Sequence, residues 1–218
     1  MLIRKFNFCV LFLFAALSLW AQEPLRFQDE VNKLVAGDSA VGKKNIILFI
    51  GSSTIRFWKD LNTTFPDRNI LNRGFGGSEM SDLIKYVDRL IVPYHPKQIF
   101  IYEGDNDIGY GKNPDDVLKQ ANQLLLLIRE KLPKRTQMFF ISPKPSISRW
   151  QLKDKYEYYN QELEKWTMQQ KKVIFIDVWK PMLDTDGNVM KDLFIGDGLH
   201  MNSKGYEIWA RIIGPYIK

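Results

Sequence analysis

The amino-acid sequence predicts an α/β protein, a three-layer α/β/α sandwich around a five-stranded parallel sheet. The first supporting observation is rhythm, because short apolar runs alternate with longer amphipathic stretches from residue 45 to the end of the chain. The second is that each apolar run is short enough for one buried strand and too short for a helix. The third is composition: 218 residues, 45% hydrophobic and 26% charged, suit one globular domain with a sizeable core.

The expected elements follow one another regularly along the chain. Strands are expected at 45–50, 69–72, 98–102, 137–141 and 173–176. Helices are expected at 27–35, 78–90, 114–132, 152–170 and 203–216, and Asn113 with Pro114 is a typical helix start. Strands that alternate with helices form a parallel sheet covered on both faces, with right-handed connections. The common, flavodoxin-like order 2-1-3-4-5 brings the loops after strands 1, 2 and 3 to one crevice.

The amino terminus predicts export. Arg4 and Lys5 precede an apolar run over residues 6–20, and Ala21 then offers a small residue for cleavage. This pattern is typical of a signal peptide, here 1–21, followed by an N-terminal extension at 22–44 and the main domain at 45–218. We expect a periplasmic or extracellular protein without stable membrane insertion after cleavage, with an uncleaved anchor as the alternative. The single cysteine, Cys9, lies in the segment to be removed, which argues against thiol catalysis and cysteine metal sites.

Charge argues against nucleic acid as a partner. The formal net charge is +6, and the Lys and Arg residues are scattered among Asp and Glu. No basic stripe with interleaved aromatic residues is present in the sequence. A solvated surface of mixed charge is therefore the favoured interpretation.

Four short segments carry residues suited to chemistry. The first three leave strands 1, 2 and 3, and the fourth must fold back over the same crevice after strand 5. They are GSST at 51–54, GFGGS at 74–78, GDND at 104–107 and DGLH at 197–200. Each is weak by itself, since such residues also form tight turns, helix caps and structural histidines. Together, in this order and at these strand ends, they indicate a catalytic site.

A serine hydroxyl needs a base within hydrogen-bond reach. Of the 2 histidines, His95 enters strand 3 from the wrong end of the sheet, whereas His200 follows Asp197 by three positions. That spacing can place a carboxylate on Nδ1 of the imidazole, which orients the base. A glycine-rich turn and the Asn106 amide could donate hydrogen bonds to an oxyanion.

At these segments the sequence resembles the SGNH hydrolase superfamily, the GDSL-like lipase and acylhydrolase proteins. The resemblance runs from strand 1 to the end of the chain and implies the SGNH three-layer fold. It implies Ser53 as nucleophile, His200 as base, Asp197 as orienter, and Ser53, Gly77 and Asn106 as the oxyanion hole. The family's Gly-Asp-Ser reads Gly51-Ser52-Ser53 here, so both serines need testing, and Gly76 is the neighbour of Gly77 that could be mistaken for it. The resemblance implies ester or thioester hydrolysis without a metal or other cofactor.

The expected substrate is a small-molecule or glycan ester with a short acyl group, O-acetyl included, because no long apolar insertion could serve as a lid. Arg149 or Trp150, in the proline-rich loop after strand 4, is expected to contact substrate, although a purely rigid loop is the plainer interpretation. The alternatives are a lysophospholipase, a thioesterase or a catalytically silent carbohydrate-binding protein. Less favoured are a nucleotide site at the glycine-rich turn and a metal site at Glu103, Asp105 and Asp107. The sequence carries no signal about oligomeric state.

Overall fold

The computed structural model describes residues 25–38 and 44–218, so the predicted signal peptide at 1–21 lies outside the described residues. The described chain contains a five-stranded sheet in the order β2-β1-β3-β4-β5, and every pair of neighbours is parallel. This confirms the predicted fold class and strand order. The strands are β1 Ile47–Gly51, β2 Ile70–Gly74, β3 Gln98–Tyr102, β4 Gln137–Ile141 and β5 Val173–Ile176.

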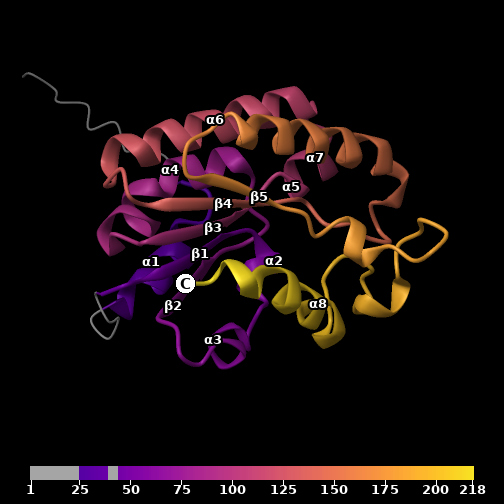
Figure 1. The fold of residues 1–218 in the computed structure, drawn as a ribbon, viewed down its shortest axis with the longest axis horizontal. Coiled ribbons are helices and arrows are strands. Elements are labelled where there is room, and N and C mark those ends of the chain that lie inside the picture. The colour runs from indigo at the N-terminus through magenta and orange to yellow at the C-terminus, as the bar shows by residue number, and fades with distance from the viewer. Residues whose placement is uncertain (1–24, 39–43) are drawn as a thin grey trace, which may run out of the picture.

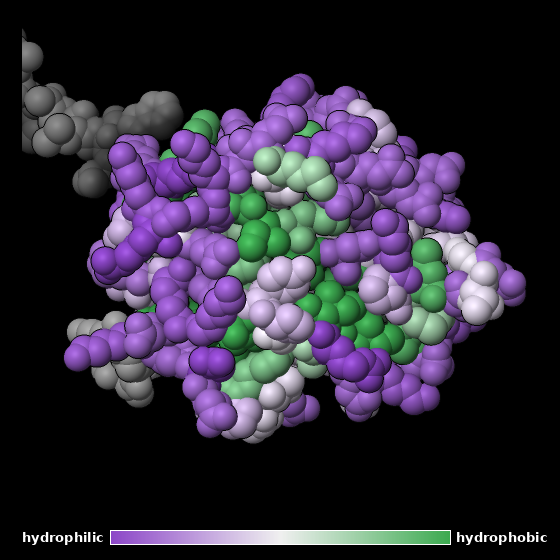
Figure 2. All heavy atoms as spheres, in the orientation of Figure 1, coloured by the Kyte–Doolittle hydropathy of each residue, from purple (hydrophilic) through white to green (hydrophobic). Residues whose placement is uncertain are grey.

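Helices cover both faces of the sheet (Figure 1). The long helices α4 Met80–Leu90, α6 Pro114–Lys131 and α7 Lys153–Met168 lie on one face, and α8 Ser203–Ile213 lies on the other. Successive strand residues point to opposite faces of the sheet and form one apolar core on each face. Leu48 and Ile99 pack with the α4–α6–α7 layer, whereas Phe49 and Phe100 pack with α8. On the face seen in Figure 2, polar side chains cover the outer helices and apolar atoms show between them.

Three short helices were not predicted from the sequence. They are α2 Ser53–Arg56, α3 Leu61–Thr64 and α5 Asp105–Gly109, and two of them begin at segments singled out for chemistry. Helices this short have no apolar periodicity to reveal them. α2 and α5 place Ser53 and Asn106 in the first turn of a helix, directly after a buried strand.

The register of the sheet brings the predicted loops together. Gly51 at the end of β1 pairs with Gly74 of β2 on one side and with Tyr102 of β3 on the other. The three loops that follow therefore start side by side at the carboxyl edge of the sheet. Gly51 has φ 139°, and a Cβ there would lie 2.0 Å from the carbonyl oxygen of Tyr102. Glycine at this position lets strand 1 turn sharply into α2.

The N-terminal extension packs against the domain. Its helix α1, Gln28–Ala36, follows Phe27, whose ring meets Phe75 edge-on at 5.5 Å between centroids. The Tyr86 hydroxyl donates a hydrogen bond to the Arg26 carbonyl at 2.7 Å. The structure thus attaches residues 25–36 to the loop after β2. Within the described ranges, no helix combines the length and the apolar character needed to cross a bilayer.

Candidate active site

Ser53 and His200 meet at the carboxyl edge of the sheet. Ser53 Oγ lies 2.9 Å from His200 Nε2, and His200 Nδ1 lies 2.6 Å from Asp197 Oδ2. With the imidazole proton on Nδ1, Nδ1 donates to the carboxylate and Nε2 accepts from the serine hydroxyl. Ser52 instead precedes α2 as its N-cap, and its N–H donates to the Tyr102 carbonyl at 3.2 Å. Of the two candidate serines, Ser53 is therefore the one in contact with the histidine.

The segment from Ile195 to His200 reaches Ser53 by forming a closed turn. The Ile195 N–H donates to the His200 carbonyl at 2.9 Å, which ties the two ends of the turn together. Gly198, with φ 64°, accepts from the Ser148 N–H at 3.0 Å, so the turn is also attached to the loop after β4. The Phe57 ring packs edge-on against the His200 ring at 4.9 Å. The imidazole is thereby held from two sides.

Asp197 is fixed in its ionised form. Its Oδ1 accepts hydrogen bonds from the N–H groups of Leu199 and His200, both at 2.9 Å. Partial burial raises the pKa of Asp197, but these hydrogen bonds and the His200 side chain outweigh burial and bring it to about 2. The carboxylate is therefore charged throughout the neutral range and can stabilise a protonated imidazole.

Gly77 and Asn106 lie next to each other. A Cβ built on Gly77 would be 3.8 Å from Asn106 Nδ2. One N–H of that amide donates to the Ser78 carbonyl at 2.9 Å, which leaves the second N–H for another acceptor. Gly76 faces elsewhere, because its Cβ would lie 2.1 Å from the Phe27 ring and its φ is 41°. Of the two glycines, Gly77 is the one beside the asparagine amide.

Glu103 and the two acidic residues of the third segment, Asp105 and Asp107, take separate partners. Ser78 Oγ donates to Glu103 at 2.6 Å, and burial raises the pKa of Glu103 well above its usual value. Asp107 accepts from the Met80 N–H at 3.0 Å, and Asp105 is enclosed by cationic and phenolic groups. Within the described residues, no group of three or more His, Cys, Asp or Glu side chains is arranged to hold a metal ion. The carboxylates act instead as structural ties between loops.

The Asp107 contact also bears on the nucleotide alternative. A phosphate at the glycine-rich turn would bind the free N–H groups at the start of α4. The Met80 N–H there already donates to both oxygens of Asp107, at 3.3 and 3.0 Å. The protein's own carboxylate thus occupies the place of an external anion.

Arg149 and Trp150 have different surroundings. The Arg149 guanidinium turns inward and donates to Asp105 Oδ1 at 2.6 Å and to Asn106 Oδ1 at 2.9 Å. Trp150 stacks on Trp179 at 6.1 Å and borders a cavity of about 840 Å³. Neither arrangement tests contact with a substrate, and that expectation stays a prediction.

Two neighbours of the site were not predicted from the sequence. Lys144 is 1% exposed, and its Nζ lies 3.4 Å from Asp105 Oδ2. Arg26 donates to the Gly77 carbonyl at 3.3 Å and to Glu79 at 2.8 Å, so the N-terminal extension contacts the loop beside Asn106. From sequence, lysine and arginine are expected at the surface, and no local sequence pattern indicates contacts with residues far along the chain.

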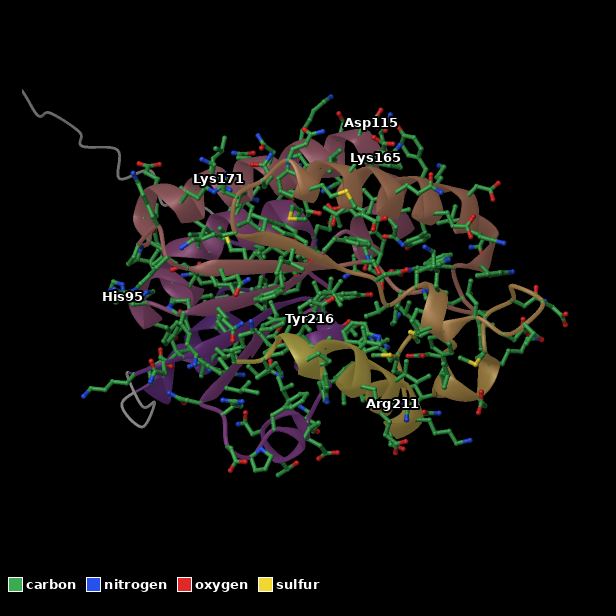
Figure 3. The ribbon with its side chains drawn as sticks, viewed as in Figure 1. His95, Asp115, Lys165, Lys171, Arg211 and Tyr216 are labelled. Carbon is green, nitrogen blue, oxygen red and sulfur yellow. The ribbon has the colours of Figure 1, made fainter. Side chains whose placement is uncertain are left out.

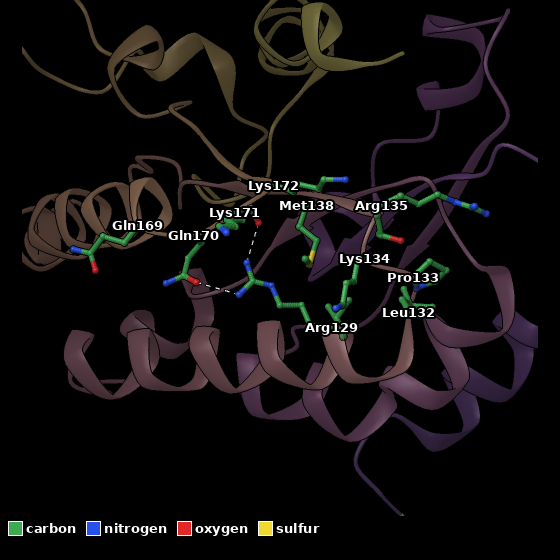
Figure 4. Close-up of a pocket in the computed structure, with 12 residues that line it drawn as sticks. Arg129, Leu132, Pro133, Lys134, Arg135, Met138, Gln169, Gln170, Lys171 and Lys172 are labelled. Carbon is green, nitrogen blue, oxygen red and sulfur yellow. Dashed lines mark hydrogen bonds between the residues drawn. The ribbon is translucent and has the colours of Figure 1, made fainter.

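A second cavity lies away from this site (Figure 4). It measures about 740 Å³ and sits between the carboxyl end of α6 and the turn into β5. Arg129 crosses it, donating to Gln170 Oε1 at 3.1 Å and to the Lys171 carbonyl at 2.9 Å. Lys171 and His95 both lie at the opposite end of the sheet from Ser53 (Figure 3). His95 is therefore remote from the site.

The model of the GDSL-like Lipase/Acylhydrolase family matches residues 37–208. The chain belongs to this family. As a GDSL-like acylhydrolase it is a hydrolase of ester bonds, and the matched residues include all four segments singled out from the sequence. No curated protein matches the chain.

Solved structures share the fold of this GDSL-like acylhydrolase. A Streptococcus pneumonia protein aligns with TM-score 0.79 and 22% identity, over 89% of this chain and 94% of its own. A GDSL-like lipase from Bacteroides thetaiotaomicron aligns with TM-score 0.74 and 19% identity, over 89% and 98%. A variant of an acetyl-xylooligosaccharide esterase from Geobacillus Stearmophilus aligns with TM-score 0.66 and 15% identity, over 81% and 95%. At these identities the likeness establishes the fold.

Proposed function

We propose that this GDSL-like acylhydrolase is an exported serine esterase that cleaves short acyl esters, O-acetyl groups included, and that glycans carry these groups. The observation that carries the proposal is the continuous contact from Ser53 Oγ through His200 to Asp197, at 2.9 and 2.6 Å. Such a chain converts a weak hydroxyl nucleophile into an effective one.

The reaction begins when His200 Nε2 accepts the Ser53 proton as Oγ attacks the ester carbonyl. The imidazolium that forms is stabilised by the Asp197 carboxylate, which stays ionised because its pKa is about 2. His200 then gives the proton to the leaving alcohol, and an acyl group remains on Ser53. In the second half, His200 takes a proton from water, the hydroxide attacks the acyl carbon, and Ser53 recovers its proton as the acid departs.

The oxyanion of each tetrahedral intermediate would be held by three donors. They are the N–H groups of Ser53 and Gly77 and the free N–H of Asn106 Nδ2. Gly77 and Asn106 are adjacent, with 3.8 Å between Asn106 Nδ2 and the position of a Gly77 Cβ. Donors fixed in advance at this spot stabilise developing charge without the reorganisation that water would need.

Two exposed aromatic side chains border the surroundings of Ser53. Tyr110 is 61% exposed, and its hydroxyl lies 3.5 Å from the position of a Gly77 Cβ, so it borders the proposed oxyanion hole. Phe57 is 37% exposed on the His200 side. Arg56 lies over the Phe57 ring and Arg149 over the Tyr110 ring, so the exposed parts of these two side chains are what a sugar could contact. A lysophospholipase or thioesterase activity and a catalytically silent carbohydrate-binding role remain the alternatives.

Three measurements test the proposal. A serine-directed fluorophosphonate should label the protein and its Ser52→Ala variant, and should fail to label Ser53→Ala. Hydrolysis should then be compared across acetyl, butyryl and long-chain test esters, acetylated xylan and an acyl thioester. Absence of labelling would favour the silent binder, and a preference for long chains or thioesters would favour the acylhydrolase alternatives.

Export is tested by the mass and location of the protein when it is expressed with residues 1–21 and without them.

A further inference from the structure

The side chain of Asn106 is held at its oxygen as well as at its nitrogen. Its Oδ1 accepts a hydrogen bond from Arg149 Nη2 at 2.9 Å, while its Nδ2 donates to the Ser78 carbonyl at 2.9 Å. Together these contacts fix both the plane of the amide and the assignment of its two ends. The amide plane then fixes the direction of the second N–H, and Nδ2 lies 3.8 Å from the position of a Gly77 Cβ.

Arg149 itself sits in a site shaped for a guanidinium. Its Nη1 donates to the Asp105 carbonyl at 2.9 Å and to Asp105 Oδ1 at 2.6 Å, and its side chain is only 11% exposed. A Cβ on Gly109 would lie 2.6 Å from the Arg149 Cζ, so a glycine in α5 is needed for this approach. The Tyr156 hydroxyl donates to the same Asp105 carbonyl at 2.7 Å. Arginine, with its planar fork, can serve both acceptors at once, which lysine cannot do in the same geometry.

Two basic side chains share the Asp105 carboxylate beside Asn106. Asp105 lies between two cations, Arg149 at 2.6 Å and the fully buried Lys144 at 3.4 Å. One carboxylate therefore balances two buried positive groups. Positive charge in a region of low dielectric favours an anion that forms nearby.

We propose that Arg149 is a positioning residue for the oxyanion donor: it holds Asn106 Oδ1, aims the free N–H of Asn106 at the substrate oxygen and strengthens that N–H as a donor. A cationic donor on the amide oxygen draws electron density from the amide nitrogen, so the N–H becomes more polar. The effect grows as negative charge develops on the substrate oxygen, because a more polar N–H is attracted more strongly to a charged oxygen than to a neutral one. Arg149 thereby acts on kcat through Asn106.

The inference rests on the proposed function for its kinetic part, and a structural measurement stands apart from it. In the folded full chain labelled with ¹⁵N, the Asn106 side-chain NH₂ signals are identified by their loss in Asn106→Ala. In Arg149→Lys we expect those signals to shift and their hydrogen exchange to speed up. Unchanged signals would overturn the inference, even if the protein hydrolysed no ester at all.

The kinetic test is a double-mutant cycle on a test ester. Asn106→Ala should lower kcat by about 10²–10³. Arg149→Lys should lower kcat by about 10- to 100-fold with little change in KM, a range known for residues that orient a metal ligand. In Arg149→Lys/Asn106→Ala the loss should equal that of Asn106→Ala alone, because Arg149 then has no amide to hold. Losses that multiply, or a kcat unchanged in Arg149→Lys, would overturn the inference.

Arg129→Lys is the matched control. It makes the same chemical change at an arginine that also ties two segments, through Gln170 and the Lys171 carbonyl, at the far end of the sheet. Its kcat and its Asn106 signals should equal those of the parent protein. If Arg129→Lys lowered kcat as much as Arg149→Lys, the effect would be one of general stability and the inference would fail. A parent protein without labelling or ester hydrolysis, but with shifted Asn106 signals in Arg149→Lys, would refute the proposed function alone.

Discussion

Ser53 and His200 are separated by 147 positions in the chain, and their side chains meet at 2.9 Å. The contact depends on two unrelated features of the fold. The sheet register brings the end of β1 between the ends of β2 and β3 at the carboxyl edge, and the turn from Ile195 to His200 folds back over that edge. Any change that moves the turn should therefore affect the reaction more than it affects the core.

The first prediction separates the two serines. Ser53→Ala should lower kcat by about 10⁶, since the nucleophile is lost, as in other serine hydrolases. Ser52→Ala should keep most of the activity, because Ser52 contacts the sheet through its backbone N–H and not the imidazole. Steady-state hydrolysis of an acetyl ester measures both variants. An inactive Ser52→Ala protein with a native unfolding midpoint would contradict the assignment.

The second prediction concerns Asp197 and pH. Asp197→Asn should lower kcat by about 10³–10⁴, because the carboxylate no longer orients and stabilises the imidazolium. In the parent protein Asp197 should not contribute to the acid limb of kcat/KM, since its pKa is about 2. A pH profile of kcat/KM on a neutral ester gives the measurement. A further ionisation above pH 4 in the parent profile that disappears in Asp197→Asn would belong to Asp197 and would contradict this prediction.

Stability should follow the same group with a defined sign. The folded pKa of Asp197 is lowered from 3.8 to about 2, so the folded state binds this proton less readily than the unfolded state. Its contribution to stability is present above pH 3.8 and is lost as the pH falls toward 2. The effect should be small, because 43% of this side chain is exposed. The free energies of unfolding of the parent and Asp197→Asn should converge as the pH falls through that window. A difference between them that grows as the pH falls would contradict the prediction.

The third prediction distinguishes the two glycines. Gly77→Ala should fold normally and lose on the order of 10² in kcat/KM, because the new methyl would lie 3.5 Å from the Tyr110 hydroxyl and beside Asn106 Nδ2. Gly76→Ala should instead destabilise the protein by about 1–3 kcal/mol, because φ is 41° and the methyl would clash with Phe27. Thermal unfolding and ester hydrolysis on both variants give the comparison. The reverse pattern would assign the donor to Gly76.

The fourth prediction concerns the buried cations. Asp105→Asn should lower the free energy of unfolding by about 3–5 kcal/mol, because Lys144 and Arg149 would lose their shared partner in the interior. Burial raises the pKa of Asp105, but those two cations outweigh it and hold the pKa below its usual range. Denaturant unfolding near neutral pH measures the loss.

Asp116→Asn is the control for that loss. It removes the same charge from an exposed pair: the Asp116 side chain is 61% exposed and the Lys119 side chain 75%. The free energy of unfolding should therefore fall far less than in Asp105→Asn. Equal losses of unfolding free energy in Asp105→Asn and Asp116→Asn would contradict the prediction, because burial of the Asp105 ion pairs would then not increase their contribution to stability.

Much of the architecture could be predicted because its causes are local. Buried strands 98–102 and 137–141 match β3 and β4, since a parallel strand covered on both faces is apolar throughout. Asn113 caps α6 through the Asp115 N–H, as the Asn-Pro start indicated. The boundaries at β2 and α4 differ by about two residues, because Gly74 extends the strand and the capping box of Glu79 and Asp82 starts the helix at Met80. Short helices such as α5 lack any periodic signal.

The sequence by itself determined the fold class, the family and the small set of residues from which a site could be built, because strand periodicity and short motifs are encoded locally. Tertiary structure decided which serine touches His200, which glycine lies beside Asn106, and where Arg149 points. It also buried Lys144, a residue that any local reading would place in solvent. These outcomes depend on the directions of side chains brought together from distant segments. That geometry is fixed only when the sheet, the turn at 195–200 and the loop after β4 pack against one another.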